Sequence, residues 1–265
     1  PCSCSGAQKA APAEERRYTL SRYKMSLIIT VYVREGIVMA ADSRLTLNFP
    51  RTTPDGQTNV LSITSSDSAK KLFLSPNNIG IATCGPADIG GVPIAGFIES
   101  FIVEKIKGQS LGVEQVAIEL KTYFGVLGVR PGAVFHVAGY ARDNEILEQK
   151  LFLVDPAAGT LKQLNPANQQ GANWGGEIDV LQRLLNEVAL IQSDGSNPVP
   201  LPFFGVPFEF FTLQDAVDFA FYGIRSTIDT LRFQAREKTV GGPIDVLVIR
   251  PDSSHWIEEK KLTVR

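Results

Sequence analysis

Ser26 and Asp42 stand near the two ends of a segment that is typical of two short strands. Residues 26–44 are mostly apolar and rich in β-branched side chains, and Arg34-Glu35-Gly36 is typical of a tight turn. In an antiparallel pair folded about Glu35, we expect Ser26 opposite Arg44 and one diagonal step from Asp42. The pattern therefore predicts a hydroxyl and a carboxylate in one corner of a sheet.

Cleavage between Met25 and Ser26 would add a free α-amine to that corner. Such an amine has a reference pKa of about 7.7–8.0, so it can act as a base near neutral pH. A residue whose own amine activates its own side-chain oxygen is an N-terminal nucleophile. With Met25 attached, the nitrogen is an amide and supplies no base. This segment therefore predicts covalent catalysis by Ser26, provided that the bond before it is cut.

Further along the chain, Lys70-Lys71-Leu72-Phe73 and Gly80–Gly85 follow the Ala-Asp-Ser-Arg sequence that ends at Arg44. This order resembles the β-type subunits of the proteasome and their bacterial relatives. The resemblance runs from about Ser26 to Arg250 and is sharpest between Ser26 and Gly85. It implies a four-layer αββα sandwich, an α+β fold with the sheets in the centre.

The resemblance assigns roles to individual residues. Ser26 stands where the family has its threonine nucleophile, and Asp42 and Lys71 match the carboxylate and the lysine of the polar site. The backbone N–H of Gly85 matches the donor of the oxyanion hole. Glu237, in Glu-Lys-Thr-Val-Gly-Gly, matches the aspartate of the family's later Asp-x-x-Ser-Gly-Gly and is expected to support the site from behind.

The chain also departs from the family pattern. Serine replaces threonine at the nucleophile, and residues 44–70 form a longer segment than is usual. Val240 replaces the serine of the later motif, and the family's Ser-Gly-Ser turn has no clean counterpart near Gly171–Gly176. These changes leave the fold expectation intact and weaken the case for ordinary proteolysis.

The leading expectation is a proteasome-like peptidase acting through an acyl-enzyme on a peptide or protein substrate. The resemblance implies no metal and no organic cofactor, and it implies self-assembly, with a ring as one form of homo-oligomer. One alternative is a transpeptidase, because some proteasome homologues cut and rejoin peptide bonds. The other is a noncatalytic assembly subunit similar to the proteasome α type, in which Met25-Ser26 is never cut.

Residues 1–25 are expected to be distinct from a single domain over 26–265. Residues 14–24 are charged and could form a short helix, and the segment lacks the apolar stretch of a secretion signal. Met25 is either the initiator, whose removal exposes Ser26, or the end of a propeptide or permanent arm. A noncatalytic assembly subunit would also retain residues 1–25 as such an arm.

The composition of the chain limits the classes of partner that are expected. A formal net charge of −2 gives no electrostatic case for nucleic acid. No apolar run approaches the roughly 20 residues that span a bilayer, so no membrane partner is expected. The 44% hydrophobic content is that of a globular protein, and cytoplasmic residence is the default expectation.

Cysteine and histidine suggest little further chemistry. The three cysteines, Cys2, Cys4 and Cys84, are too few and too oddly spaced for a disulfide framework or a zinc site. Cys84 is an alternative nucleophile, but a small buried hydrophobe is the simpler interpretation. The ordinary interpretation of Asp42 and Lys71 is likewise a structural ion pair.

Hydrophobic periodicity predicts strands, two helices, strands, two helices and strands, which is typical of α+β layers. Helices are expected at about 88–107, 113–127, 176–190 and 213–234, the last opened by a near capping box at Thr212–Asp215. Strands are expected at 70–74, 79–83, 133–140, 149–154, 160–164, 244–250 and 255–262.

Overall fold

The computed structural model describes residues 25–265 apart from 53–55, 57, 129–130, 144–145, 166–168, 262–263 and 265. It is a mixed α/β structure whose strands all pair antiparallel. The strands are β1 (Leu27–Val33), β2 (Gly36–Ala41), β3 (Leu45–Thr52), β4 (Thr58–Ser66), β5 (Leu72–Leu74), β6 (Gly80–Cys84), β7 (Asp88–Ile89), β8 (Val92–Pro93), β9 (Val134–Asp143), β10 (Ile146–Asp155), β11 (Thr160–Gln163), β12 (Gly171–Gly176), β13 (Ala189–Leu190), β14 (Val199–Pro200), β15 (Asp245–Ile249) and β16 (Ser254–Glu258). The helices are α2 (Ile94–Phe101), the π-helical turn η2 (Ile102–Ile106), α3 (Val113–Val126), α4 (Asp179–Leu185), the 3-10 turn η3 (Phe208–Phe210) and α5 (Leu213–Phe233).

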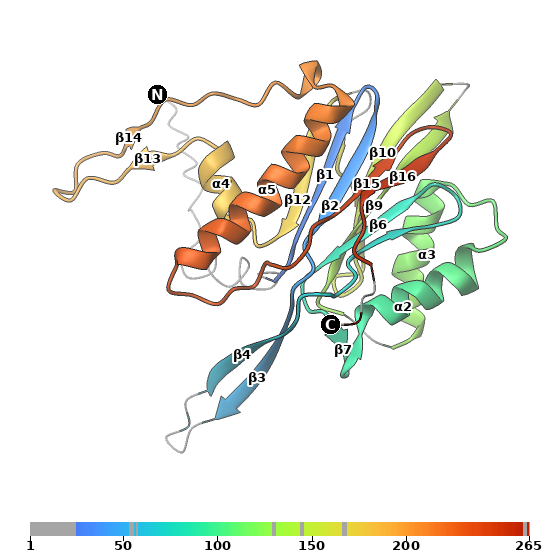
Figure 1. Cartoon of the computed structure of the whole chain (residues 1–265), viewed down its shortest axis with the longest axis horizontal. Helices are drawn as coiled ribbons and strands as arrows, with labels where there is room; N and C mark the ends of the chain where they lie inside the picture. Colours follow the sequence, from blue (N-terminus) through green and yellow to red (C-terminus); the bar gives the residue numbers. More distant parts are fainter. Residues whose placement is uncertain are drawn as a thin grey trace, which may run out of the picture.

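Two five-stranded sheets form the centre of the molecule (Figure 1). The first has the order β12-β1-β2-β15-β16 and the second the order β11-β10-β9-β6-β5. Helix α5 packs on β1, β2 and β15, and α3 packs on β9, β10 and β11. The two sheets therefore carry their helices on separate faces.

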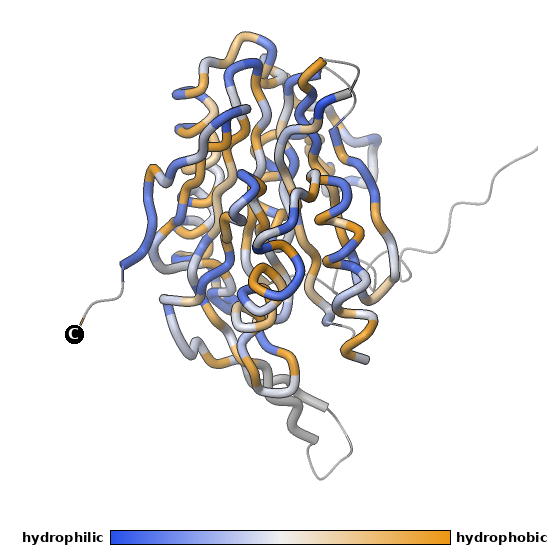
Figure 2. The backbone as a smooth tube through the Cα atoms, turned by 90° about the vertical axis from the view of Figure 1, so that its right-hand side faces the viewer, coloured by the Kyte–Doolittle hydropathy of each residue, from blue (hydrophilic) through white to orange (hydrophobic). Residues whose placement is uncertain are grey.

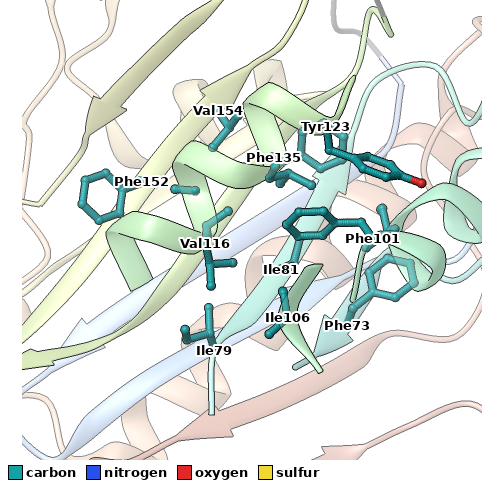
Figure 3. Packing of buried hydrophobic residues seen from close by; sticks show 14 of the residues in the cluster. Phe73, Ile79, Ile81, Phe101, Ile106, Val116, Tyr123, Phe135, Phe152 and Val154 are labelled. Atoms are coloured by element: carbon teal, nitrogen blue, oxygen red, sulfur yellow. The ribbon is translucent and has the colours of Figure 1, made fainter. Parts of the chain in front are cut away.

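Three hydrophobic clusters hold these elements together. One joins α2 and α3 to the second sheet, and Figure 3 shows part of it, with Phe135 and Phe152 among its side chains. Phe135 stacks on Phe124 at a centroid distance of 5.2 Å. A second joins α4 and α5 to the first sheet. The third contains residues from both sheets, among them Ile28, Met39 and Ala138. Along the tube of Figure 2, apolar and polar residues alternate over short distances, as expected for elements with one buried face.

The hairpin β1–β2 differs from the expected register by one residue. Its turn consists of two residues, Arg34 and Glu35, so Val33 pairs with Gly36 and Ile28 with Ala41. The N–H of Asp42 donates to the carbonyl of Leu27 at 3.2 Å, so Asp42 faces Leu27 and not a diagonal neighbour of Ser26. The turn is therefore centred between Arg34 and Glu35, and not at Glu35 as predicted. A shift of one residue in the register moves each side chain to the opposite face of the strand relative to its partner.

The helix expected from residue 88 begins only at Ile94. Asp88–Ile89 and Val92–Pro93 form a small hairpin, and Gly90 and Gly91 between them have positive φ. That conformation suits a turn and not a helix. After Phe101 the chain continues as the π-helical turn η2, which ends at Ile106.

The helix α3 matches the predicted amphipathic pattern over most of its length. Val113, Val116, Ala117, Leu120 and Phe124 are buried as expected, whereas Leu127 is exposed at its C-cap. Helix α5 also agrees with its prediction, because the side chains and backbones of Thr212 and Asp215 form a capping box.

The helix expected over 176–190 is much shorter, since α4 covers only Asp179–Leu185. Gly171–Gly176, for which no element was expected, is the edge strand β12, paired with β1. The sequence between Arg44 and Lys70 forms the hairpin β3–β4, which projects from the body of the molecule (Figure 1). The predicted helix at 14–24 lies outside the described residues.

In the described part of the chain, no helix has both the length and the apolar character needed to cross a bilayer.

Candidate active site

Ser26 directly precedes β1 and is held there by backbone hydrogen bonds on both sides. Its N–H donates to the carbonyl of Thr239 at 3.2 Å, and its carbonyl accepts the N–H of Glu177 at 2.8 Å. The residue is 2% exposed and has φ 69°, a left-handed conformation that non-glycine residues seldom adopt. A Cβ at Gly176 would come within 2.0 Å of the Ser26 carbonyl oxygen, so this close approach requires glycine.

The carbonyl oxygen of Met25 accepts the backbone N–H of Gly85 at 3.0 Å. Gly85 follows β6 and has φ 107°, and a Cβ there would lie 3.0 Å from both Ala133 Cα and Gly132 O. Both the conformation and the close contact therefore favour glycine. The N–H predicted as an oxyanion donor thus points at the carbonyl of the peptide bond between Met25 and Ser26.

Asp42 follows β2 and is fully buried, and each of its carboxylate oxygens accepts two hydrogen bonds. Oδ1 accepts the Leu27 N–H at 2.9 Å and Lys71 Nζ at 2.8 Å. Oδ2 accepts the Arg44 N–H at 3.1 Å and the Gly241 N–H at 3.0 Å. A buried carboxylate needs such partners to offset its desolvation, and this one ties β1, β5 and the loop after α5 together.

Lys71, directly before β5, is the cation of this pair. Its side chain is 4% exposed, and its backbone carbonyl accepts the Thr83 N–H at 2.9 Å. Burial of the ammonium lowers the pKa of Lys71 below its ordinary value, while the attraction of Asp42 opposes that shift. The structure therefore brings Asp42 and Lys71 together as the sequence predicted, and the neighbouring Lys70 instead pairs with Glu99 at the surface.

Arg44 fixes the loop that carries Gly241. Its guanidinium binds both oxygens of Asp67, at 2.7 and 2.9 Å, and donates to the Lys238 carbonyl at 3.3 Å. A Cβ at Gly241 would lie 2.5 Å from Arg44 Cζ, so the guanidinium packs directly on the loop backbone. This contact positions the backbone N–H of Gly241, which donates to Asp42 Oδ2.

Beside Ser26 lies a cavity of about 310 Å³. Ser26, Lys71 and Gly85 all line it, which places the three predicted groups around one space. The other lining residues are mostly small or apolar: Leu45, Ser66, Ser68, Ala69, Lys70, Thr83, Cys84, Pro86, Ala87, Pro93, Ile94 and Ala95. Concave, mostly apolar spaces with a few polar groups are typical of ligand sites.

The structure does not bring Glu237 into this cluster. Its side chain is exposed, and among the described residues no hydrogen bond or ion pair joins it to Ser26, Asp42 or Lys71. The expectation for Glu237 is therefore not met. The buried carboxylate on that side of Ser26 belongs to Glu177, which arrives from the end of β12.

Glu177 is a site residue that the sequence analysis missed. Its carboxylate accepts the Thr239 hydroxyl at 3.0 Å and pairs with Arg236 at 3.3 Å. Burial, strengthened by the neighbouring Asp179, raises the pKa of Glu177 above its ordinary value. No local motif marks this residue, because Glu177 and Thr239 meet only through the fold.

Cys84 is buried, as expected for a small hydrophobe. Burial raises the pKa of its thiol to about 12. A buried thiol that stays protonated is a poor nucleophile, which argues against Cys84 as the alternative nucleophile. Within the described residues, no group of three or more His, Cys, Asp and Glu side chains is placed to hold a metal ion.

A scan of the chain against protein-family models and a search of curated proteins each found no match.

Proposed function

We propose that this chain is an N-terminal-nucleophile amidohydrolase that cuts its own Met25–Ser26 bond and then acts on peptide bonds with Ser26. The observation that carries the proposal is the hydrogen bond from the Gly85 N–H to the Met25 carbonyl oxygen, at 3.0 Å. A donor in this position polarises the carbonyl that the Ser26 hydroxyl would attack. The left-handed backbone of Ser26 also supports it, because backbone strain concentrates at reactive sites.

In the first step, Ser26 Oγ bonds to the Met25 carbonyl carbon, and the developing charge on the Met25 oxygen is held by the Gly85 N–H. The C–N bond then breaks, the serine proton ends on the freed nitrogen, and Met25 remains as an ester on Ser26. Water hydrolyses this ester and leaves Ser26 with a free α-amine. That amine becomes the base for later cycles.

In later cycles, the same groups would act on a peptide substrate. Ser26 Oγ attacks the substrate carbonyl, the amine takes the serine proton through a water and passes it to the leaving nitrogen, and the acyl-enzyme is hydrolysed. The ammonium of Lys71 lies on the same cavity as Ser26 and favours the neutral amine. Asp42 keeps that ammonium in place through the 2.8 Å ion pair.

The cavity beside Ser26 suggests which substrates fit. Its apolar lining residues include Leu45, Ala69, Ala87 and Ile94, and Lys70 and Lys71 also line it. Apolar walls favour an apolar side chain on the residue whose carbonyl is attacked. We therefore expect cleavage after apolar residues.

The arrangement of the two sheets and their helices supports a further part of the proposal, a four-layer αββα sandwich of the N-terminal-nucleophile type. The cluster shared by both sheets and the two clusters under the helices are what such layers require. Self-assembly and residence in the cytoplasm belong to the same proposal.

The experiment compares Ser26→Ala with Ser43→Ala in assays of peptide amides that carry an apolar residue before the cleaved bond. Ser43 is a matched control, because it is also buried and its hydroxyl has no hydrogen-bond partner in the described residues. Loss of an essential nucleophile costs many orders of magnitude, about 10⁶-fold in a well-studied serine protease. We expect Ser26→Ala to lose all measurable activity and Ser43→Ala to keep it. Equal activity in both variants would overturn the proposal.

A further inference from the structure

Three hydrogen bonds form a closed clamp around the backbone of Ser26. The Ser26 N–H donates to the carbonyl of Thr239 at 3.2 Å, and the Glu177 N–H donates to the carbonyl of Ser26 at 2.8 Å. The Thr239 hydroxyl then donates to the Glu177 carboxylate at 3.0 Å. Both backbone groups of Ser26 are therefore held by two residues that are also hydrogen-bonded to each other.

The two residues of the clamp come from segments that are themselves fixed. Glu177 directly follows β12, which pairs with β1 along its whole length (Figure 1). Thr239 lies in the loop after α5, and two residues further on the Gly241 N–H donates to Asp42 Oδ2 at 3.0 Å. Both Thr239 and Glu177 are buried. The loop that holds the Ser26 nitrogen therefore also holds the buried carboxylate of the site.

The backbone of Ser26 needs this support. Its φ of 69° is one that non-glycine residues seldom adopt, and such a conformation persists only where the surrounding contacts determine it. The clamp holds the peptide groups on both sides of the Ser26 Cα, so it restrains φ and ψ together. These two angles set the directions in which the nitrogen and the side chain of Ser26 point.

Thr239 and Glu177 lie outside the space in which a substrate would be bound. The described residues that line the 310 Å³ cavity include Ser26 but neither Thr239 nor Glu177. Any influence of these two residues on a reaction in that cavity would therefore pass through the backbone of Ser26. The hydrogen bond between Thr239 and Glu177 is formed by side chains, so a substitution can remove it while the backbone hydrogen-bonding groups stay in the chain.

We propose that Glu177 and Thr239 are positioning residues that hold the nitrogen and the hydroxyl of Ser26 in the geometry for reaction. Before cleavage, they fix the peptide group whose Met25 carbonyl accepts the Gly85 N–H. After cleavage, the Thr239 carbonyl accepts a proton of the free amine and so directs the lone pair that serves as the base. The positioning role rests on the proposed function of Ser26, whereas the clamp itself does not.

The clamp is tested first by amide hydrogen exchange in full-length Ser26→Ala, which has no serine nucleophile. Thr239→Val keeps the size of the side chain and removes its hydroxyl. We expect the amides of residues 26 and 177 to exchange about fivefold to tenfold faster in this variant, the size of one hydrogen bond.

Thr227→Val is the matched control for this measurement. Thr227 is buried in α5, and its hydroxyl donates to the Gly223 carbonyl at 2.9 Å, so the control loses the same kind of bond outside the clamp. The amides of residues 26 and 177 should keep their exchange rates in it. Equal exchange at these two amides in Thr239→Val and Thr227→Val would overturn the clamp.

The effect on cleavage is measured in chains that keep Ser26, by following intact mass during cell-free synthesis. We expect Thr239→Val to slow the loss of residues 1–25 by about tenfold to a hundredfold, because a small misplacement of reacting groups has effects of that size. Thr239→Ser restores the hydroxyl and should recover most of the parent rate. Thr227→Val should cleave at the parent rate, and an equal rate in Thr239→Val would contradict the positioning role.

Peptide hydrolysis by the cleaved protein separates positioning from substrate binding. Because Thr239 does not line the 310 Å³ cavity, Thr239→Val should lower kcat and leave KM unchanged. Glu177→Ala opens the clamp from its other end, and the double variant should be no slower than Glu177→Ala alone. A raised KM with unchanged kcat in Thr239→Val would contradict the inference.

The combined outcomes distinguish this inference from the proposed function. Faster exchange in Thr239→Val, together with a parent chain that never cleaves, would sustain the clamp and refute the proposed function. Normal cleavage in both the parent and Thr239→Val would refute the positioning role and leave the proposed function intact.

Discussion

The two sides of Ser26 are built differently. On one side, Asp42 and Lys71 are buried, and both carboxylate oxygens of Asp42 are fully used by four donors. On the other, Glu177 shares the partly exposed Arg236 with Asp179, and His136 keeps a ring nitrogen without a described protein partner beside a cavity.

The two sides therefore differ in how tightly their charged groups are held. A carboxylate whose two oxygens are both fully hydrogen-bonded holds its partner cation in one place and admits little rearrangement. Glu177 and His136, by contrast, both line a cavity of about 450 Å³. Under the proposed function, the first side therefore suits groups that keep one geometry in every cycle, whereas side chains on the second side have more room to move.

Breaking the buried pair should give the largest effect on stability. Lys71→Met leaves the Asp42 carboxylate buried without its cation, which we expect to lower the free energy of unfolding by about 3–5 kcal/mol. Lys70→Met is the control, because its pair with Glu99 is exposed and should be worth at most about 1 kcal/mol. Urea denaturation of both variants measures the difference. Equal losses of unfolding free energy in the two variants would show that the buried Asp42–Lys71 pair stabilises the fold no more than an exposed pair does.

Moving the donor at Gly85 should slow the cleavage before Ser26. Gly85→Ala places a Cβ in contact with Ala133 and demands a strained φ, which displaces the N–H from the Met25 carbonyl. We expect cleavage to slow by about 10²–10³-fold, the usual effect of losing one oxyanion donor. Gly90→Ala also has positive φ but open space around it, and it should cleave at the normal rate. A time course of intact mass distinguishes the two.

On the cavity side, Thr30→Val should show how much the stability of the fold depends on the hydrogen bond between Thr30 and His136. The variant leaves Nδ1 buried without a hydrogen bond, and we expect a loss of about 1–2 kcal/mol in the free energy of unfolding. Thr83→Val is matched, since Thr83 is also buried but its hydroxyl has no partner in the described residues. It should be neutral or slightly stabilising, and a loss equal to that of Thr30→Val would contradict the account.

The smallest effect concerns the pH dependence contributed by Glu177. Because its folded pKa is raised, the folded state binds the proton more tightly than the unfolded state does. The resulting stability is fully present below the unfolded value near 4.5 and is lost as the pH rises through the folded pKa. The stability of the parent protein relative to Glu177→Gln should therefore fall between pH 4.5 and neutrality. Denaturation at a series of pH values tests this, and a rise over that range would contradict the raised pKa.

The sequence predicted the side of the site that is built from local motifs. Asp42 and Lys71 each sit at the end of a short apolar strand, and hydrophobic pattern locates such strands well. Gly85 follows a strand in the same way. The exact pairing was less predictable, because one residue in the turn decides which position faces Asp42.

The other side depends on contacts between distant segments. Glu177 meets Thr239 and Arg236 only after β12 has paired with β1, and β12 contains three glycines that conceal a strand from propensity alone. Glu237 lies exposed and outside the cluster, because matching a motif in order cannot show which carboxylate is buried. The cavity beside His136 likewise exists only once the two sheets are packed.

The most direct test of the central claim is the intact mass, with N-terminal sequencing, of the full 265-residue chain and its Ser26→Ala variant after purification. The account predicts that the parent chain begins at Ser26 and that the variant keeps Met25 and the residues before it. A parent chain that retains Met25 would leave Ser26 without its base. It would contradict self-cleavage and favour a noncatalytic assembly subunit.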